Sequence, residues 1–387
     1  MTNLRILHCL RAPVGGLFRH VRDLSAAQSA AGHDVGVIVD SSTNDCLTER
    51  RLGELQANLT LGLHRCAMSR DIGWRDLTAA HATAKLAKSL QIDVIHGHGA
   101  KGGAYGRLAA VVLRAQRRPI MSFYTPHGGS LHYAPSSLKG RIFMALEKGL
   151  GRSTDGVIFE SAYSAGIYGR NVGEIAGATR VIPNGLLASE FTSHRPFPDA
   201  TDIVFIGELR HLKGVDLLLE ALALLDRNPA ITATIVGEGP DAAQFVKTAT
   251  RLGLNNRVRF PGAMPAAQAF PLGRVLVMPS RAESFPYIVL EAAAAGIPLI
   301  ATSVGGIPEI VEGSDTELVA PENIAALASA VAAVLADPAG ALNRAARLKA
   351  SVASRFTVER MSSAIVTFYS DARPLILAPT GLRRAEA

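Results

Sequence analysis

Short apolar runs alternate with longer amphipathic stretches along almost the whole chain. In the first half, the apolar runs predict strands at residues 4–10, 34–39, 93–96, 120–124, 156–159 and 180–182. The stretches between them repeat apolar positions at helical spacing and predict helices at residues 18–31, 77–90, 103–115 and 137–150. Strands that alternate with helices in this way favour a parallel sheet covered by helices on both faces.

The pattern starts again after a proline-rich segment. Residues 183–199 contain three prolines and have no periodicity, so they predict a linker. Further strands follow at residues 203–206, 231–236, 257–260, 275–278, 299–302 and 317–319. We therefore expect two Rossmann-like α/β domains, at 1–185 and 186–355, with a cleft between them. A last helix at 356–371 is predicted to cross back to the first domain, and residues 372–387 are predicted to form a tail.

Composition agrees with a two-domain α/β enzyme. A chain of 387 residues is too long for one ordinary core. Three cysteines without CxxC spacing give neither a disulfide framework nor a zinc site. The N-terminus does not have the pattern of a signal peptide, and no apolar run approaches the roughly 20 residues of a membrane span, which together predict a soluble, cytoplasmic protein. Neither G-x-G-x-x-G nor G-x-x-x-x-G-K-[ST] occurs at a strand end, so a dinucleotide redox cofactor and a P-loop are not predicted.

Charge is uneven between the two halves. Residues 1–185 contain 22 Lys and Arg against 13 Asp and Glu, a net charge of +9, and the remainder contains 18 against 20, a net charge of −2. A basic first half fits an anionic acceptor or the anionic inner face of a membrane. Ordinary solvated surface charge explains the same excess. No feature of the sequence indicates a nucleic-acid partner.

Two acids, Glu283 and Glu291, stand eight residues apart where a predicted strand passes into an alanine-rich helix. We expect Ser284 to cap that helix, with Pro286 in its first turn. The strand-to-helix edge is where α/β proteins bind ligands. Because ionised carboxylates only accept hydrogen bonds, this pair is suited to the hydroxyls of a sugar and a ribose.

Two further turns of the second half predict phosphate binding. The first, residues 207–214 (GELRHLKG), places Arg210 and Lys213 between a strand and the amino end of a helix, where a diphosphate is favoured. The second contains Gly305 and Gly306, whose small size permits close approach of backbone amides to phosphate oxygens.

The first half carries glycines and histidines after its strands. Gly15 and Gly16 follow the first strand, His96 and His98 lie at the end of the third, and His127 follows the fourth. His127 is the best candidate for contact with a substrate. His96 and His98 are interpreted as polar lining, because no further His, Cys or Asp in the sequence is expected to complete a metal site with them.

With these motifs the chain resembles the retaining glycosyltransferases of family four, which have the GT-B fold of two facing Rossmann-like domains. The resemblance covers nearly the whole chain, and its most specific part is E-x7-E followed by GGxPE. It implies transfer of a sugar from a nucleotide diphosphate donor to an acceptor without a required metal or cofactor. It also implies a first domain on the acceptor side and a second domain that binds the donor.

Residue by residue, the resemblance implies contact of Glu283 with the donor sugar and of Glu291 with the ribose. Lys213 would neutralise the pyrophosphate, His127 would lie beside the transferred sugar, and Gly15 and Gly16 would meet the donor or the acceptor. Two positions depart from the family pattern. Glu208 stands where an arginine is usual, so Arg210 is expected to take that role, and Pro286 replaces a glycine between the two acids.

The function expected from the sequence is transfer of a hexose to a glycan or lipid-linked acceptor in polysaccharide biosynthesis, in the cytoplasm or at the inner face of the membrane. Since no carboxylate nucleophile is identifiable, attack on the same face as the leaving phosphate is favoured. Two alternatives stay open. One is an epimerase or phosphorylase of the same fold, and the other is a sugar-nucleotide binding subunit without catalysis.

Overall fold

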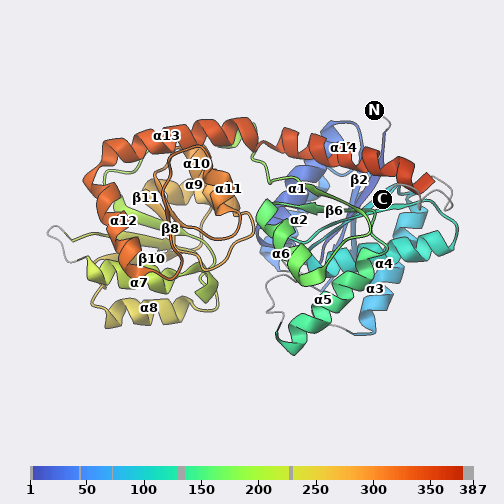
Figure 1. Ribbon diagram of the computed structural model, residues 1–387, viewed down its shortest axis with the longest axis horizontal. Helices are drawn as coiled ribbons and strands as arrows, with labels where there is room; N and C mark the ends of the chain where they lie inside the picture. The colour runs from blue at the N-terminus through green and yellow to red at the C-terminus, as the bar shows by residue number, and fades with distance from the viewer. Residues whose placement is uncertain (1–2, 43–44, 72, 129–135, 226–229, 378–387) are drawn as a thin grey trace. The chain divides into compact units, whose positions relative to one another are not determined.

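The computed structural model describes the chain apart from residues 1–2, 43–44, 72, 129–135, 226–229 and 378–387. It divides into two compact units, one made of Met1–Gly185 with Val358–Ala387 and the other of Leu186–Thr357 (Figure 1). Each unit contains one sheet in which all paired strands are parallel. The predicted fold class is thereby confirmed.

Unit 1 has a sheet with strand order β3-β2-β1-β4-β5-β6-β7. The strands are β1 Arg5–Cys9, β2 Asp34–Asp40, β3 Gly62–Cys66, β4 Val94–His98, β5 Met121–Thr125, β6 Gly156–Phe159 and β7 Ala178–Val181. The helices are α1 Gly15–Ala30, α2 Cys46–Gln56, α3 Arg75–Ser89, α4 Gly99–Ala115, α5 Leu138–Gly151, α6 Ala162–Val172 and α14 Val358–Leu377. The strand order reverses direction between β1 and β4, so ligands are expected at the carboxyl ends of these two strands.

The last helix belongs to unit 1. α14 packs beside α1 and against β5 and β6 (Figure 1). Its buried side chains Ile365 and Phe368 join a core that contains Ile6 of β1 and Phe123 of β5. The helix continues to Leu377, so the predicted start of a tail at residue 372 was wrong, and residues 378–387 lie outside the described part of the chain.

Unit 2 has the strand order β10-β9-β8-β11-β12-β13. The strands are β8 Thr201–Ile206, β9 Ala233–Val236, β10 Val258–Gly262, β11 Gly273–Met278, β12 Leu299–Thr302 and β13 Leu318–Val319. The α-helices are α7 Val215–Leu224, α8 Ala242–Arg251, α9 Ala266–Ala269, α10 Tyr287–Ala295, α11 Ile307–Val311, α12 Ile324–Ala336 and α13 Pro338–Arg355, and short 3-10 turns include η2 Ala188–Glu190, η3 His211–Lys213 and η4 Phe270–Leu272. The reversal between β8 and β11 places the turns after these strands at the expected ligand edge.

Within the described part of the chain, no single helix has the length and apolar composition of a membrane span. α12 and α13 reach both together, but the chain bends by 101° between them.

Candidate active site

The turn after β8 brings the predicted diphosphate-binding lysine to the amino end of α7. Gly214 precedes α7 in a left-handed conformation, with φ of +72°. A Cβ atom at this position would lie 2.0 Å from the carbonyl oxygen of Pro279, so only glycine fits. Tight contact between this turn and the turn after β11, which contains Pro279, therefore fixes the position of Lys213.

Lys213 and Glu283 form an ion pair. Lys213 Nζ donates to both carboxylate oxygens of Glu283, at 2.7 and 2.9 Å. The hydroxyl of Ser280 donates to Oε1 of the same carboxylate at 2.8 Å, and the Glu283 side chain is only 7% exposed. Two residues with separately predicted roles, one for phosphate and one for sugar, thus form a single polar unit.

A glycine turn supports the glutamate from the side of β12. Gly305 has a φ of +61°, and a Cβ atom there would lie 1.8 Å from the backbone oxygen of Glu283. The amide of Gly306 donates to the carbonyl of Ser284 at 2.7 Å. The Gly306 amide is therefore already hydrogen-bonded within the protein, and the helix that follows, α11, has only five residues. The two glycines thus serve to hold the Glu283 loop.

We expect Gly305→Ala to disturb this loop. Any non-glycine residue in the left-handed region costs roughly 1–2 kcal/mol, and here the backbone of Glu283 must also move. Gly313→Ala is the matched control, because Gly313 has a φ of +73° but open space around its Cβ position. Calorimetry should show a larger loss of melting temperature for Gly305→Ala, together with weaker nucleotide-sugar binding. Equal losses in both variants would contradict the supporting role.

Arg281, which sequence reasoning missed, ties the two turns together. Its guanidinium donates to both oxygens of Asp216, at 2.8 and 2.7 Å, and to the carbonyl of His211 at 2.7 Å. Burial opposes ionisation of Asp216, but the hydrogen bonds from Arg281 hold the pKa of this carboxyl below its usual value. By contrast, Arg210 is 54% exposed and its nearest acid is Glu208, at 3.6 Å.

The helix that carries Glu291 is α10, which begins at Tyr287. Pro286 and not Ser284 occupies its N-cap position, so the expectation of Ser284 as the N-cap was wrong. Glu291 is the fifth residue of α10 and is half-buried, whereas its neighbours Leu290 and Ala292 are fully buried.

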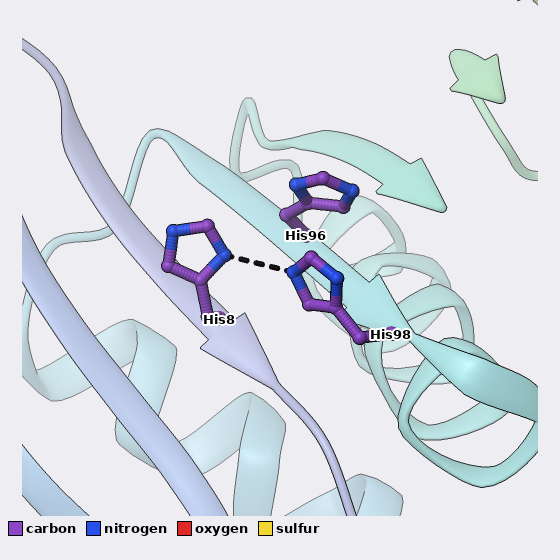
Figure 2. A group of neighbouring side chains, drawn as sticks. All are labelled: His8, His96 and His98. Atoms are coloured by element: carbon purple, nitrogen blue, oxygen red, sulfur yellow. Dashed lines mark hydrogen bonds between the residues drawn. The ribbon is translucent and has the colours of Figure 1, made fainter. Parts of the chain in front are cut away.

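In unit 1, five histidines gather under the carboxyl edge of the sheet. His8 of β1 pairs in register with His96 of β4, and His98 ends the same strand. Figure 2 shows these three rings facing one another. His20 of α1 and His127, after β5, complete the group, with His20 and His127 ring centroids 4.8 Å apart. The expectation that no further histidine joins His96 and His98 was wrong.

A chain of hydrogen bonds runs through this cluster. His8 Nε2 bonds to Gln28 Oε1 at 2.7 Å, and His8 Nδ1 to His98 Nε2 at 2.9 Å (Figure 2). His98 Nδ1 bonds to His127 Nε2 at 3.1 Å, and His127 Nδ1 to Glu160 Oε1 at 2.5 Å. Gln28 and Glu160 both accept, so three neutral imidazoles supply one hydrogen too few for four hydrogen bonds. The extra proton completes the bond between His127 and Glu160.

Electrostatics keep the carboxyl of Glu160 ionised. Burial opposes ionisation of Glu160, but the charge of His127 and its hydrogen bond hold the pKa of this carboxyl below its usual value. Deeper in the cluster, burial lowers the pKa of His8 to about 4 and that of His20 to about 3, so both are neutral. The backbone φ of His127, +51°, is rare for a non-glycine residue and marks a constrained position.

The three histidines of Figure 2 offer ring nitrogens within 4.8 Å of one another, a spacing that a metal ion would allow. Each of these nitrogens has a protein partner, which for His96 are the hydroxyls of Tyr369, at 2.6 Å, and Thr125, at 2.8 Å. Hydrogen bonds to protein groups thus account for the arrangement of the three rings.

The glycines of unit 1 have different tasks. Gly15, with a φ of +62°, opens α1 and has open space around its Cβ position, and Gly16 follows it in the helix. Gly102 and Gly103 instead let α4 lie against the sheet, since a Cβ atom would come within 2.2 Å of Cys9 or Tyr124. Gly129, two residues after His127, lies outside the described residues.

Two family models match the chain. Residues 14–187 match the model described as Glycosyltransferase Family 4, and residues 189–354 match the model described as Glycosyl transferases group 1. A glycogen synthase of Mycobacterium tuberculosis is 30% identical, with 93% of this chain and 92% of that protein covered. A D-inositol 3-phosphate glycosyltransferase of Streptomyces bingchenggensis is 35% identical over 45% of this chain and 41% of that protein.

Solved structures agree on the fold. Sucrose-phosphate synthase from Thermosynechococcus elongatus has a TM-score of 0.78 and 24% identity, covering 97% of this chain and all of that one. Anabaena Alr3699/HepE, solved in complex with UDP and glucose, has a TM-score of 0.78 and 22% identity, covering 95% of this chain and all of that one. The chain thus belongs to the glycosyltransferases of family four, and it is an enzyme of the GT-B fold.

Proposed function

We propose that this glycosyltransferase is retaining and metal-independent, and that it moves a hexose from a nucleoside diphosphate sugar to a glycan or lipid-linked acceptor in polysaccharide biosynthesis. The observation that carries the proposal is the ion pair of Lys213 and Glu283 beside the amino end of α7. Solved relatives of the same fold that bind UDP or UDP-glucose support a nucleotide-sugar donor.

Breaking the glycosyl–phosphate bond leaves positive charge on the sugar ring and negative charge on the departing diphosphate. Lys213, Arg210 and the amino end of α7 supply positive charge for that diphosphate in place of a metal. Glu283 accepts hydroxyl hydrogens of the donor sugar, and Glu291 those of the ribose. The turn at Gly305–Gly306 holds the loop of Glu283 against the donor, and the turn at Gly15–Gly16 permits close approach of the backbone to the substrates.

The hydrogen bonds that Glu283 accepts support same-face attack. Both of its oxygens accept from Lys213, and one also accepts from Ser280. A carboxylate fixed in this way is a poor nucleophile for the anomeric carbon. The leaving phosphate is therefore the better base for the acceptor's proton, and the new bond forms on the face that the phosphate leaves.

His127 is proposed to donate a hydrogen bond to the transferred sugar. Nδ1 of His127 bonds to Glu160, so Nε2 is the nitrogen proposed to donate to a hydroxyl oxygen of the transferred sugar, in place of its bond to His98. The protein is proposed to act in the cytoplasm, at the inner face of the membrane, where the basic first half of the chain meets anionic lipid.

We expect a thermal-shift screen to find a nucleotide sugar that raises the melting temperature. With that donor and an acceptor panel, NMR of the product should show the donor's anomeric configuration, and EDTA should leave the rate unchanged. An inverted product contradicts retention, and loss of activity in EDTA contradicts metal independence. An altered nucleotide sugar formed without acceptor supports an epimerase, a requirement for phosphate supports a phosphorylase, and binding without turnover supports a silent subunit.

A further inference from the structure

Helix α5 exposes an apolar stripe on the side that faces away from its own core. Leu138 is 75% exposed, Ile142 46% and Leu146 44%. Successive helical residues turn by about 100°, so positions four apart differ by only about 40° and these three side chains form one row. The buried residues Gly140, Glu147 and Gly151 lie on the opposite side of the helix. An ordinary surface helix has the reverse arrangement, with its apolar row turned inward.

Basic residues border this row on both sides. Arg141, Lys148 and Arg152 follow one edge of the stripe and Lys139 the other, and all four are exposed. The only acid between residues 136 and 152 is Glu147. Glu147 is buried and bonds to Arg107 at 2.8 Å and to the Tyr124 hydroxyl at 2.9 Å. The exposed surface of α5 is therefore apolar and cationic.

The buried side of α5 keeps this surface in place. The guanidinium of Arg107 stacks on the ring of Tyr124, 3.9 Å from its centroid, while it pairs with Glu147. At the other end, Ser137 caps α5 by accepting from the amide of Gly140. Figure 1 shows α5 on the periphery of unit 1. The stripe is thus presented by a folded, anchored helix.

We propose that this α5 face, made of Leu138, Ile142 and Leu146 with Lys139, Arg141, Lys148 and Arg152, docks on an anionic lipid surface. An interfacial helix lies flat with its apolar row among the acyl chains and its basic residues at the headgroups, which is the distribution that α5 shows. The net charge of +9 on residues 1–185 adds long-range attraction of the same sign. The inference names the surface for the proposed membrane location, and it is tested without any sugar substrate.

The test is co-sedimentation of the full chain with vesicles of phosphatidylcholine containing 30% phosphatidylglycerol, and with pure phosphatidylcholine. We expect binding to the anionic vesicles at low salt and weak binding to the neutral ones. Each basic residue near an anionic surface contributes about 1 kcal/mol, or roughly fivefold in partition, so K139Q/R141Q/K148Q should lower the partition coefficient about 100-fold. The apolar variant L138Q/I142Q/L146Q should lower it at least about tenfold.

A matched control uses exposed apolar residues of unit 2. V246Q/L342Q replaces side chains that are 45% and 57% exposed and should bind vesicles like the unchanged protein. Transfer to a water-soluble acceptor should be unchanged in all variants, which separates this inference from the proposed reaction. The inference would be overturned if the unchanged protein does not bind anionic vesicles at low salt, or if both α5 variants bind them as tightly as the unchanged protein does. It would also be overturned if sedimentation analysis shows a dimer that the apolar variant abolishes.

Discussion

Replacing Lys213 by Met is expected to lower kcat/KM for sugar transfer about 10²- to 10³-fold, the usual effect of removing one preorganised group from an electrostatic site. The variant loses the charge that we propose for the leaving diphosphate. It also removes the cationic partner of Glu283, which is 7% exposed and keeps the hydrogen bond from the Ser280 hydroxyl. Initial rates with a saturating acceptor measure the first effect, and calorimetry measures the second as a lower melting temperature.

A double variant separates catalysis from stability. Glu283→Gln removes the buried charge, so the pair Lys213→Met/Glu283→Gln should regain much of the stability that Lys213→Met loses. Transfer should stay at the low level of the single variants. Lys349→Met is the matched control and should keep full activity, because Lys349 donates to the exposed, uncharged Ser193 hydroxyl and not to a carboxylate of the site. Recovery of transfer in the double variant would show that Lys213 acts only by stabilising Glu283.

The strand and glycine patterns predicted where this site lies but not which of its side chains pair with one another. Lys213 and Glu283 are 70 residues apart, and each was found because it follows a strand of a parallel sheet. Nothing local in the sequence couples them, because their contact depends on the order in which β8 and β11 pair. Arg281 was missed for the same reason, since its partner Asp216 belongs to α7, 65 residues earlier in the chain.

Three elements of unit 1, namely β3, α2 and α6, escaped prediction, and the first two did so because they are weakly apolar. β3 (GLHRC) is an edge strand of half-buried and exposed residues, so it lacks the apolar run that marks the inner strands. α2 carries five charged or amide side chains and buries Leu52 and Leu55. Edge elements need only one covered side, and their patterns are correspondingly faint.

Three of the five histidines of the cluster were identified from the sequence. His96 and His98 lie at the end of β4 and His127 follows β5, but His8 lies inside β1 and His20 inside α1. A signal did exist in α1. His20 and Gln28 stand four residues on either side of Leu24, so two polar residues occupy its buried row. Polar residues on an inward row indicate internal hydrogen bonds, and this pattern predicts partners that the strand ends supply.

Unit 1 should lose several kcal/mol of stability as the pH falls from about 6.5 to 4.5. Burial lowers the pKa of His8 to about 4 and that of His20 to about 3, and it lowers those of His96 and His98 well below 6.5. Between these values and 6.5 the unfolded chain binds more protons than the folded one. Stability is therefore fully present above about pH 6.5 and falls as the pH drops, by about 1.4 kcal/mol per pH unit for each histidine.

Calorimetry of the full chain between pH 7.5 and 4.5, with hydrogen exchange of β1 and β4 peptides to identify unit 1, measures this loss. Asp and Glu in ordinary surroundings titrate mainly below this window, so the slope reports the buried histidines. His8→Gln and His20→Gln should each remove about one histidine's share of the slope, whereas exposed His81→Gln should leave it unchanged. A stability of unit 1 that stays flat across the window would mean that the cluster is already charged in the folded state, and the proton would then not be confined to His127 and Glu160.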